Sequence, residues 1–459
     1  MAEQAGVRVI RQADQVDNLV LAGDEFIIEA DLAPVRHAAA KRSLKQALAE
    51  IEEMTRQCLW QDIIALFHPV EEKLPEVEAC GLEVAIREKI AFAMGQLNYF
   101  DDAIEELKKA VRKEPENFFV VNSLAYTAYN SLYAAKNKEA FLLGAHKRDR
   151  IALAHEYFNR AKELRPDGVT NFYRQGMLYK QLEDKPRQAM ECFQTAIHNW
   201  GRLDTAARDK RHQEKKNYVK SLFQLAALVL NDGKAAEALT LLEKCREEDK
   251  TTDYLAPMFK MFALGKIYFH MNRFESARDA LEAAIARRKA NQPYDFVAEL
   301  LARTYICVNQ PERARAQIDR IPPHQRRAYF RWTEADVLCA LKEFDQAKIV
   351  LSKAAERDTR SRHKALIRLV KIEYLQGDFK KAEERAQEAD AFFREKWGNV
   401  CQEALFWRSL CAYQSGDYAR AETCARELND HAPYYPRLPL LVKKIREAVE
   451  RQSIVPVLT

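Results

Sequence analysis

The sequence predicts an all-α protein made of short helices packed in pairs. The clearest pair lies between Met261 and Ala284, in the stretch MFALGKIYFHMNRFESARDALEAA. Each half repeats apolar residues at the i, i+3, i+4 spacing of one buried helix face, and a turn at Asn272-Arg273 separates the halves. Small residues, Gly265 and Ala277, stand where the two helices would touch. The stretch therefore predicts a helical hairpin with a close contact between its helices.

The same pattern recurs along the chain, which is the second observation that predicts the fold. The close-approach position of the second helix is Ala in every predicted pair but the first, and six of the nine intervals between these positions lie between 33 and 39 residues. Chance could give one such helix but not this recurrence with aromatic and Pro companions. The positions are Ile63, Ala103, Ala154, Ala189, Ala238, Ala277, Ala314, Ala347, Ala382 and Ala421.

Composition agrees with a helical fold and bounds the function. The 459 residues are 47% hydrophobic and 31% charged, with only 13 Gly and 15 Pro. The 73 basic and 68 acidic residues give a net charge of +5, which favours neither a nucleic-acid nor a membrane binder. Nine scattered cysteines, no apolar run of 18 residues and no signal-peptide pattern predict a reduced, soluble, cytoplasmic protein.

Both ends of the chain depart from the repeat. Residues 1–37 are expected to form an N-terminal arm, with a short β-hairpin around the Ala-Gly-Asp turn of NLVLAGDEFIIE at Asn18–Glu29. This arm could be a simple cap or could recognise a partner. The repeats are predicted over residues 38–436. Residues 437–459 are predicted to be a capping helix, from Leu438 to Val449, followed by a tail.

Three irregularities interrupt the repeats. The third repeat carries an insertion at about residues 131–150, which must form a loop or longer helices at one edge. The fourth repeat has one extra residue near Asp184-Lys185-Pro186. A charged connection, RDKRHQEKK at Arg208–Lys216, precedes the fifth repeat.

In the second repeat, five residues occupy positions that are typical of a known repeat family. Tyr99, Ala103, Leu107, Ala110 and Pro115 follow one another as aromatic, Ala, large, Ala and Pro. In this order the sequence resembles the tetratricopeptide repeat (TPR), a helical hairpin of about 34 residues that cannot bury its apolar face alone. The resemblance implies a right-handed superhelical solenoid of about ten hairpins. It also implies a concave surface lined by the first helix of each hairpin.

The sequence contains none of the common catalytic motifs. It has no GxxxxGK[ST] phosphate loop, no GxGxxG after a strand, no HExxH and no GxSxG. Its histidines, such as His68 and His270, are not paired with Cys or another His at metal-ligand spacing. We therefore expect a protein that is not an enzyme, with no catalytic residues, no metal site and no cofactor. An unusual active site in the 1–37 arm or the 131–150 insertion is the remaining enzymatic alternative.

The concave positions implied by the resemblance are rich in aromatic residues with Lys and Arg between them. Large rings bury area at little entropic cost, and cations orient a polar partner, so this composition favours recognition of a protein segment. Some rings would instead pack between neighbouring first helices. Asn122 lacks the basic neighbours of the family's clamp for C-terminal carboxylates. The predicted partner-binding residues are Tyr126, Tyr129, Tyr173, Phe223, Phe262, Lys266, Phe269, Arg303, Tyr329, Trp332, Lys371 and Tyr374, with Phe119, Lys180, Phe259 and Phe296 at further concave positions.

The leading hypothesis is a non-enzymatic scaffold or adaptor that holds a protein or peptide segment in this groove, or the regulatory arm of a larger complex. The alternative is RNA or single-stranded DNA binding through basic turns, such as Arg208–Lys216 and Arg320–Arg331. Acidic residues lie within or beside these clusters. Salt dependence separates the two hypotheses, because phosphate contacts weaken steeply with salt and an aromatic groove does not. Neither hypothesis involves a membrane, and the sequence leaves the oligomeric state open.

Overall fold

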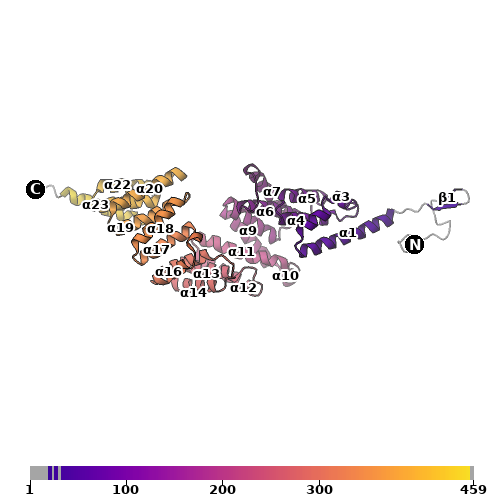
Figure 1. Cartoon of the computed structure of the whole chain (residues 1–459), viewed down its shortest axis with the longest axis horizontal. Coiled ribbons are helices and arrows are strands. Elements are labelled where there is room, and N and C mark those ends of the chain that lie inside the picture. The colour runs from indigo at the N-terminus through magenta and orange to yellow at the C-terminus, as the bar shows by residue number, and fades with distance from the viewer. Residues whose placement is uncertain (1–18, 23–24, 29–32, 455–459) are drawn as a thin grey trace. The chain divides into compact units, whose positions relative to one another are not determined.

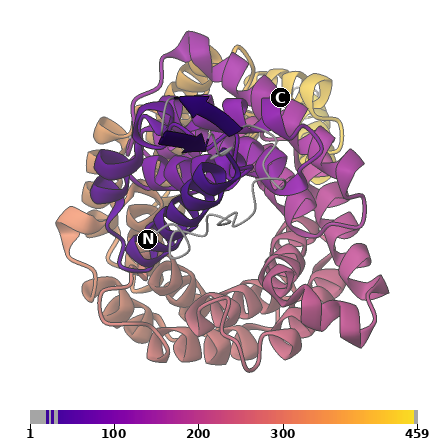
Figure 2. The same cartoon turned by 90° about the vertical axis from the view of Figure 1, so that its right-hand side faces the viewer.

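The computed structural model describes residues 19–22, 25–28 and 33–454 (Figure 1). The chain forms two compact units, Met1–Leu228 and Val229–Thr459, which we call unit 1 and unit 2. Within each unit, helices that follow one another in the sequence are also neighbours in space, as the gradual change of colour shows (Figures 1 and 2). In the part of the chain from residue 33 to 454, no helix is both long and apolar enough to cross a membrane.

Two short strands precede the helices. Strand β1 (Leu19–Ala22) pairs antiparallel with β2 (Glu25–Ile28), so that Leu19 lies opposite Ile28. The predicted turn between them and the first 18 residues of the predicted arm lie outside the described residues. Helix α1 begins at Ala33, five residues before the predicted boundary of the arm. The reason is that Pro34 is compatible with the first turn of a helix, where its missing N–H leaves no hydrogen bond unmade.

Unit 1 continues as a series of helices, with the boundary to unit 2 falling inside the last of them. The elements are α1 (Ala33–Arg56), α2 (Trp60–Phe67), α3 (Val70–Lys73), α4 (Glu83–Gln96), α5 (Phe100–Lys113), α6 (Phe118–Lys136), α7 (Gly144–Leu164), α8 (Thr170–Leu178), the π-helix η2 (Tyr179–Glu183), α9 (Pro186–Arg202), α10 (Thr205–Lys210) and α11 (His212–Asn231). Helices α4 and α5, α6 and α7, and α8 and α9 pack as hairpins.

Unit 2 repeats the arrangement more regularly. Its elements are α12 (Ala235–Glu248), α13 (Pro257–His270), α14 (Phe274–Ala286), α15 (Asp295–Cys307), α16 (Pro311–Asp319), the 3-10 helix η3 (Pro323–Gln325), α17 (Ala328–Ala340), α18 (Phe344–Arg357), α19 (Arg362–Leu375), α20 (Phe379–Trp397), α21 (Gln402–Gln414), α22 (Tyr418–His431) and α23 (Leu438–Ile454). Five hairpins follow one another from α13 to α22. The predicted all-α fold of stacked helical hairpins is confirmed.

The small residues of the repeat lie where helices touch. All ten predicted close-approach positions, from Ile63 to Ala421, have no exposed surface. Gly265 lets α14 approach closely, since a Cβ added at Gly265 would lie 2.6 Å from Leu281 Cγ and 3.3 Å from the carbonyl oxygen of Ala277. Gly176 is as constrained, with Phe193 Cε1 2.7 Å from such a Cβ. The alanines and glycines therefore set the distance between the helices of a hairpin.

Replacing Gly265 by Ala is expected to lower the free energy of unfolding by about 1–3 kcal/mol, because Leu281 must move to admit the methyl group. Gly95 is the matched control. It also lies within a helix, α4, but an added Cβ would meet nothing within 4 Å, so Gly95→Ala should be neutral or stabilising by up to about 1 kcal/mol. Urea denaturation followed by circular dichroism measures both. Equal effects of the two substitutions would contradict the assigned hairpin contact.

The three stretches that interrupt the repeats in the sequence are mostly helical in the structure. Helix α6 extends to Lys136 and α7 begins at Gly144, so most of the 131–150 insertion is helical. The extra residue of the fourth repeat is taken up by η2, because a π-turn holds one residue more than an α-turn. The stretch Arg208–Lys216, expected as a connection, belongs to α10 and the first turns of α11. At the C-terminal end, α23 continues to Ile454, beyond the predicted Val449.

Candidate functional site

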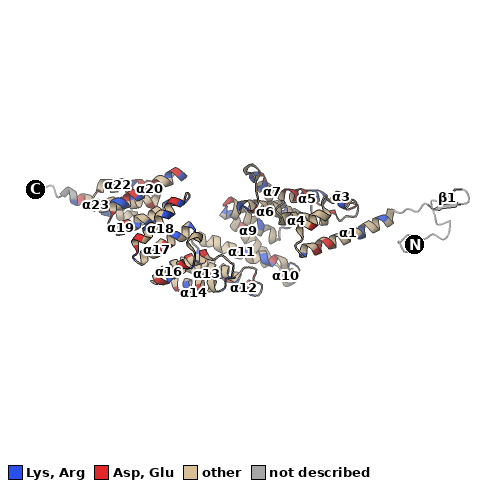
Figure 3. Cartoon of the chain, viewed as in Figure 1, with Lys and Arg blue, Asp and Glu red and all other residues tan. Residues whose placement is uncertain are grey.

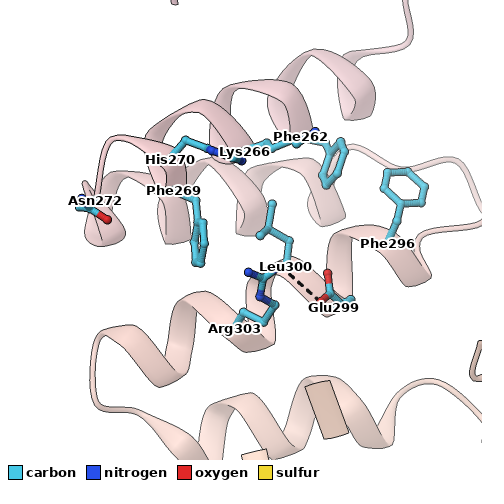
Figure 4. A pocket seen from close by; sticks show the side chains of 9 residues that line it. All are labelled: Phe262, Lys266, Phe269, His270, Asn272, Phe296, Glu299, Leu300 and Arg303. Atoms are coloured by element: carbon cyan, nitrogen blue, oxygen red, sulfur yellow. Dashed lines mark ion pairs between the residues drawn. The ribbon is translucent and has the colours of Figure 1, made fainter. Parts of the chain in front are cut away.

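The best candidate for a binding site in unit 2 is a pocket of about 400 Å³ between α13 and α15 (Figure 4). Both are first helices of their hairpins, so the pocket lies on the surface that the repeat pattern assigns to recognition. Four of the predicted residues line this pocket: Phe262, Lys266, Phe269 and Arg303. We call it the groove pocket; its lining residues are Phe262, Lys266, Phe269, His270, Asn272, Phe296, Glu299, Leu300 and Arg303.

Aromatic rings form the apolar side of the groove pocket. The ring of Phe296 meets that of Phe262 edge to face, with centroids 4.7 Å apart, and stacks on that of Phe259 at 6.1 Å. Phe262, Phe269 and Phe296 are all half-buried, whereas Leu300 beneath them is buried. The helical spacing of Phe262 and Phe269 places both on one face of α13. The rings are held by their neighbours and still present surface to a ligand.

Cations dominate the polar side of the groove pocket. The Arg303 guanidinium lies 5.0 Å from the Phe269 ring centroid and 3.7 Å from the Glu299 carboxylate (Figure 4). Lys266 has no hydrogen bond or ion pair with any other described residue. Burial, together with the charges of Lys266 and Arg303, lowers the pKa of His270. An anionic group on a ligand would therefore find the Lys266 ammonium, which no described residue pairs, and the half-exposed guanidinium of Arg303.

Glu299 is the acidic residue of the groove pocket, and its carboxylate is hydrogen-bonded to the next first helix, α17. Its carboxylate accepts a hydrogen bond of 2.6 Å from the hydroxyl of Thr333 on α17. Burial raises the pKa of Glu299, and the Thr333 hydroxyl and the Arg303 charge oppose that shift. Glu299 thus fixes Arg303 while leaving nearly half of the Arg303 side chain, 46%, exposed.

The other four predicted residues of unit 2 do not line the groove pocket. Trp332 lies under two cations of α19, with Lys364 Nζ at 5.4 Å and Arg368 Cζ at 5.5 Å from its ring. Tyr329 donates a 2.5 Å hydrogen bond to Asp295, and Lys371 pairs with Glu403 at 2.8 Å.

Tyr374 is the fourth of these residues, and it packs against aromatic neighbours. Its ring lies 5.3 Å from that of Trp407, on the next first helix, and 5.2 Å from that of Phe379. Contacts of this kind join neighbouring helices, as the alternative interpretation of these rings expects.

The predicted residues of unit 1 lie on α6, α8 and α11. Tyr129 is only 7% exposed, so its ring is mainly core, and it stacks on Tyr126 with centroids 6.1 Å apart. Tyr173 on α8 lies 6.0 Å from Phe193, and Phe223 on α11 is half-buried. The residue that the sequence reasoning missed here is Arg174, which lies over Tyr126. Its only sequence signal is a cation next to a predicted concave position.

The structure also bears on the basic clusters. Arg211, within the predicted basic connection, pairs with Asp167 at 2.6 Å and with Glu214 at 3.0 Å. Arg326, in the Arg320–Arg331 cluster, pairs with Glu334 at 2.7 Å. Acidic and basic residues are interspersed along the helices of each unit (Figure 3). Among the described residues, no three His, Cys, Asp or Glu side chains gather as a metal site would require.

The fold and the groove define a helical-repeat protein of the kind that serves protein interaction in general. The family model described as tetratricopeptide repeat matches residues 261–291, which is the α13–α14 hairpin that forms one wall of the groove pocket. The matched hairpin is thus a tetratricopeptide repeat, as the sequence pattern predicted.

Solved structures of three proteins are similar to parts of this chain at low identity. A tetratricopeptide repeat protein from Parabacteroides merdae is 14% identical, with 63% of this chain and 98% of that chain covered and a TM-score of 0.42. Yeast Tom70 is 13% identical, with 89% and 97% covered and a TM-score of 0.41. The human IFIT1 dimer with m7Gppp-AAAA is 15% identical, with 87% and 89% covered and a TM-score of 0.42. No curated protein matches the sequence.

Proposed function

We propose that this protein is a non-enzymatic scaffold or adaptor that binds a segment of a partner protein in the groove pocket of unit 2. One observation carries the proposal: three half-buried phenylalanine rings line a pocket of about 400 Å³ beside the ammonium of Lys266, which pairs with none of the residues that the structure describes. A pocket of this size takes one or two side chains, which suits an extended segment. The segment that fits best carries a large apolar side chain next to an acidic one.

The proposal divides the binding energy between two kinds of contact. The apolar side chain would fill the space between Phe262, Phe269 and Phe296, where truncation of an anchor residue typically costs about 2 kcal/mol or more. The acidic side chain would pair with Lys266 and Arg303 at the rim. Rim pairs contribute more to orientation and to the association rate than to affinity.

Nucleic-acid binding through the basic turns has less support. Such binding needs cations that are free to meet phosphates along one face. Arg211 and Arg326, in the two clusters singled out by sequence, are each held by carboxylates of the chain.

Affinity capture with the full-length protein tests the proposal. Partner proteins should remain bound after nuclease treatment and at raised salt, and they should be lost with the Lys266→Gln, Phe269→Ala double variant. Phe119→Ala is the matched control, because Phe119 is an aromatic residue of unit 1 that is 64% exposed. If nuclease treatment removes the captured proteins, or salt removes them while the double variant retains them, the proposal fails and nucleic-acid binding is favoured.

A further inference from the structure

Arg174 on α8 is a cation with no counter-ion among the described residues. Its guanidinium carbon lies 3.7 Å from the ring centroid of Tyr126 on α6, so the group lies over the face of the ring. It forms no hydrogen bond or ion pair with any residue that the structure describes. The Arg174 side chain is only half-buried. None of its nitrogens is a fully buried donor that lacks a hydrogen-bond partner, so these nitrogens reach solvent. The donor edge of this guanidinium is therefore open to a ligand.

Two other enclosed arginines of the chain, Arg87 and Arg211, are paired with carboxylates. Arg87 meets three carboxylates, and Arg211 meets those of Asp167 and Glu214. Partial burial of a charge without a partner costs free energy, so an Arg in such a place is usually paired. Burial lowers the pKa of Arg174, and only the hydroxyls of Tyr126 and Tyr173 act against that shift; no carboxylate does.

A row of tyrosines begins at Tyr126, whose ring lies under this guanidinium. Tyr126, Tyr129 and Tyr133 stack in a row along α6, with successive centroids 6.1 and 6.0 Å apart, and Tyr173 lies next to Arg174 in the chain. Burial, helped by the nearby tyrosine hydroxyls, raises the pKa of Tyr173 to about 12, so its hydroxyl stays a donor at neutral pH. None of the four hydroxyls has a hydrogen bond to another residue within the described part of the chain. Tyr129 is only 7% exposed, so the hydroxyls of Tyr126, Tyr133 and Tyr173 are the ones available to a ligand.

We propose that Arg174, with the hydroxyls of Tyr126, Tyr133 and Tyr173, forms an oxyanion-binding site in unit 1, for a carboxylate or a phosphate group. We call it the tyrosine–arginine site. An arginine presents up to five N–H donors in one plane, and stacking on a ring fixes that plane. The anion would supply the missing counter-charge and accept from the free donors. The site belongs to unit 1 and stands independently of the groove pocket.

The test titrates the full-length protein with inorganic phosphate and, separately, with sodium acetate, at constant ionic strength set by sodium chloride. The readout is the Nε–Hε nuclear magnetic resonance signal of Arg174, assigned by its absence from the Arg174→Lys variant. We expect a shift that saturates with at least one of the two anions. The anion with the lower Kd then identifies the ligand as phosphate or carboxylate.

Thermal unfolding in the same buffers gives a second readout that variants can share. The better anion should raise the Tm of the wild type, because a ligand of the folded state stabilises it. Its Kd, obtained from this rise, should increase at least tenfold in Arg174→Gln. The Kd of Arg174→Lys, which keeps the charge but loses the planar guanidinium, should lie between those of the wild type and Arg174→Gln.

Arg288→Gln is the matched control, since it removes from unit 2 an arginine that lies over a ring, that of Tyr294, outside the groove pocket, and it should leave the titration unchanged. If Arg174→Gln does not fold, Arg174→Lys and Tyr126→Phe decide, because each retains most of the side chain. The inference is overturned if neither anion saturates the Arg174 signal, or if the Kd is the same in the wild type and in the Arg174 variants.

Discussion

Replacing Arg87 by Leu is expected to lower the free energy of unfolding of unit 1 by about 3–5 kcal/mol, the largest effect of any substitution we predict for the stability of the chain. Arg87 lies in the second turn of α4 and only 2% of its surface is exposed. Leu would fit the apolar surroundings but would leave buried carboxylates without their partner. Urea denaturation followed by circular dichroism measures the change.

The reason lies in the ion-pair network around Arg87. Its Nε donates to Glu83 at 2.7 Å, one terminal nitrogen donates to Glu106 of α5, and the other donates to Glu71 at 2.7 Å. The side chains of Glu83 and Glu106 are 9% and 3% exposed, so neither can be hydrated instead. Lys109 also pairs with Glu106, at 2.9 Å, and limits the loss. Removing one member of such a network costs more than the network contributes.

Two controls accompany the Arg87 variant. Adding Glu83→Gln and Glu106→Gln should restore part of the lost stability, because neutral amides are easier to bury than unpaired carboxylates. Arg56→Leu should cost less than about 1 kcal/mol, because Arg56 is 72% exposed and forms only a surface pair with Glu53. An unchanged unfolding curve for Arg87→Leu would mean that the network does not hold α4 to α5.

The same network predicts a dependence on pH. Burial acts to raise the pKa of Glu71, but hydrogen bonds, chiefly from Arg87 and with a further one from Lys109, lower it from its ordinary value of 4.5 to about 2. Because the pKa is lower in the folded state, the stabilisation is complete above about pH 4.5 and is lost as the pH falls towards 2. In Arg87→Leu the loss of stability over this range should be smaller.

The Phe262→Ala, Phe269→Ala double variant is expected to lose most of its affinity for the partner segment. Each truncation should raise Kd about 30-fold, which corresponds to about 2 kcal/mol per anchor residue. The effect should appear mainly in the dissociation rate, because the rings supply contact area and do not steer the encounter. Surface plasmon resonance with the identified partner measures both rates.

Lys266→Gln provides the contrast within the same pocket. It removes a charge and keeps the rings, so it should mainly slow association and reduce the salt dependence of binding. Circular dichroism should show both variants folded, because Phe262, Phe269 and Lys266 are only half-buried. If the double variant binds as tightly as the wild type while Lys266→Gln does not bind, then charge and not ring contact holds the partner.

The recurrence of small residues made the fold predictable. Ala277 and its equivalents recur because two helices in close contact leave no room for a larger side chain, and that constraint acts at each hairpin separately. The extra residue near Asp184 was predictable in part. The repeat length shows that a residue is added there, but it does not show that the residue is accommodated by the π-helix η2. Local constraints of this kind need no knowledge of distant residues.

The candidate sites were predictable only in part. Helical spacing placed Phe262, Lys266 and Phe269 on one face, and the structure brings them together with Arg303. The spacing could not tell an open ring from one covered by the next hairpin, which is why Trp332 and Tyr374 were predicted alike. Whether a ring is covered depends on the side chains of the following repeat and on how they turn.

The sequence by itself determined the repeat, the hairpins and the faces on which aromatic and basic residues lie, because these follow from helical periodicity and local packing. Only the tertiary structure decided which charges are neutralised. Arg87 is enclosed by three carboxylates, Arg174 stacks on Tyr126 without any, and Lys266 has no partner among the described residues. Pairing of charges is set by distances between residues far apart in the chain, and these distances exist only once the hairpins have stacked.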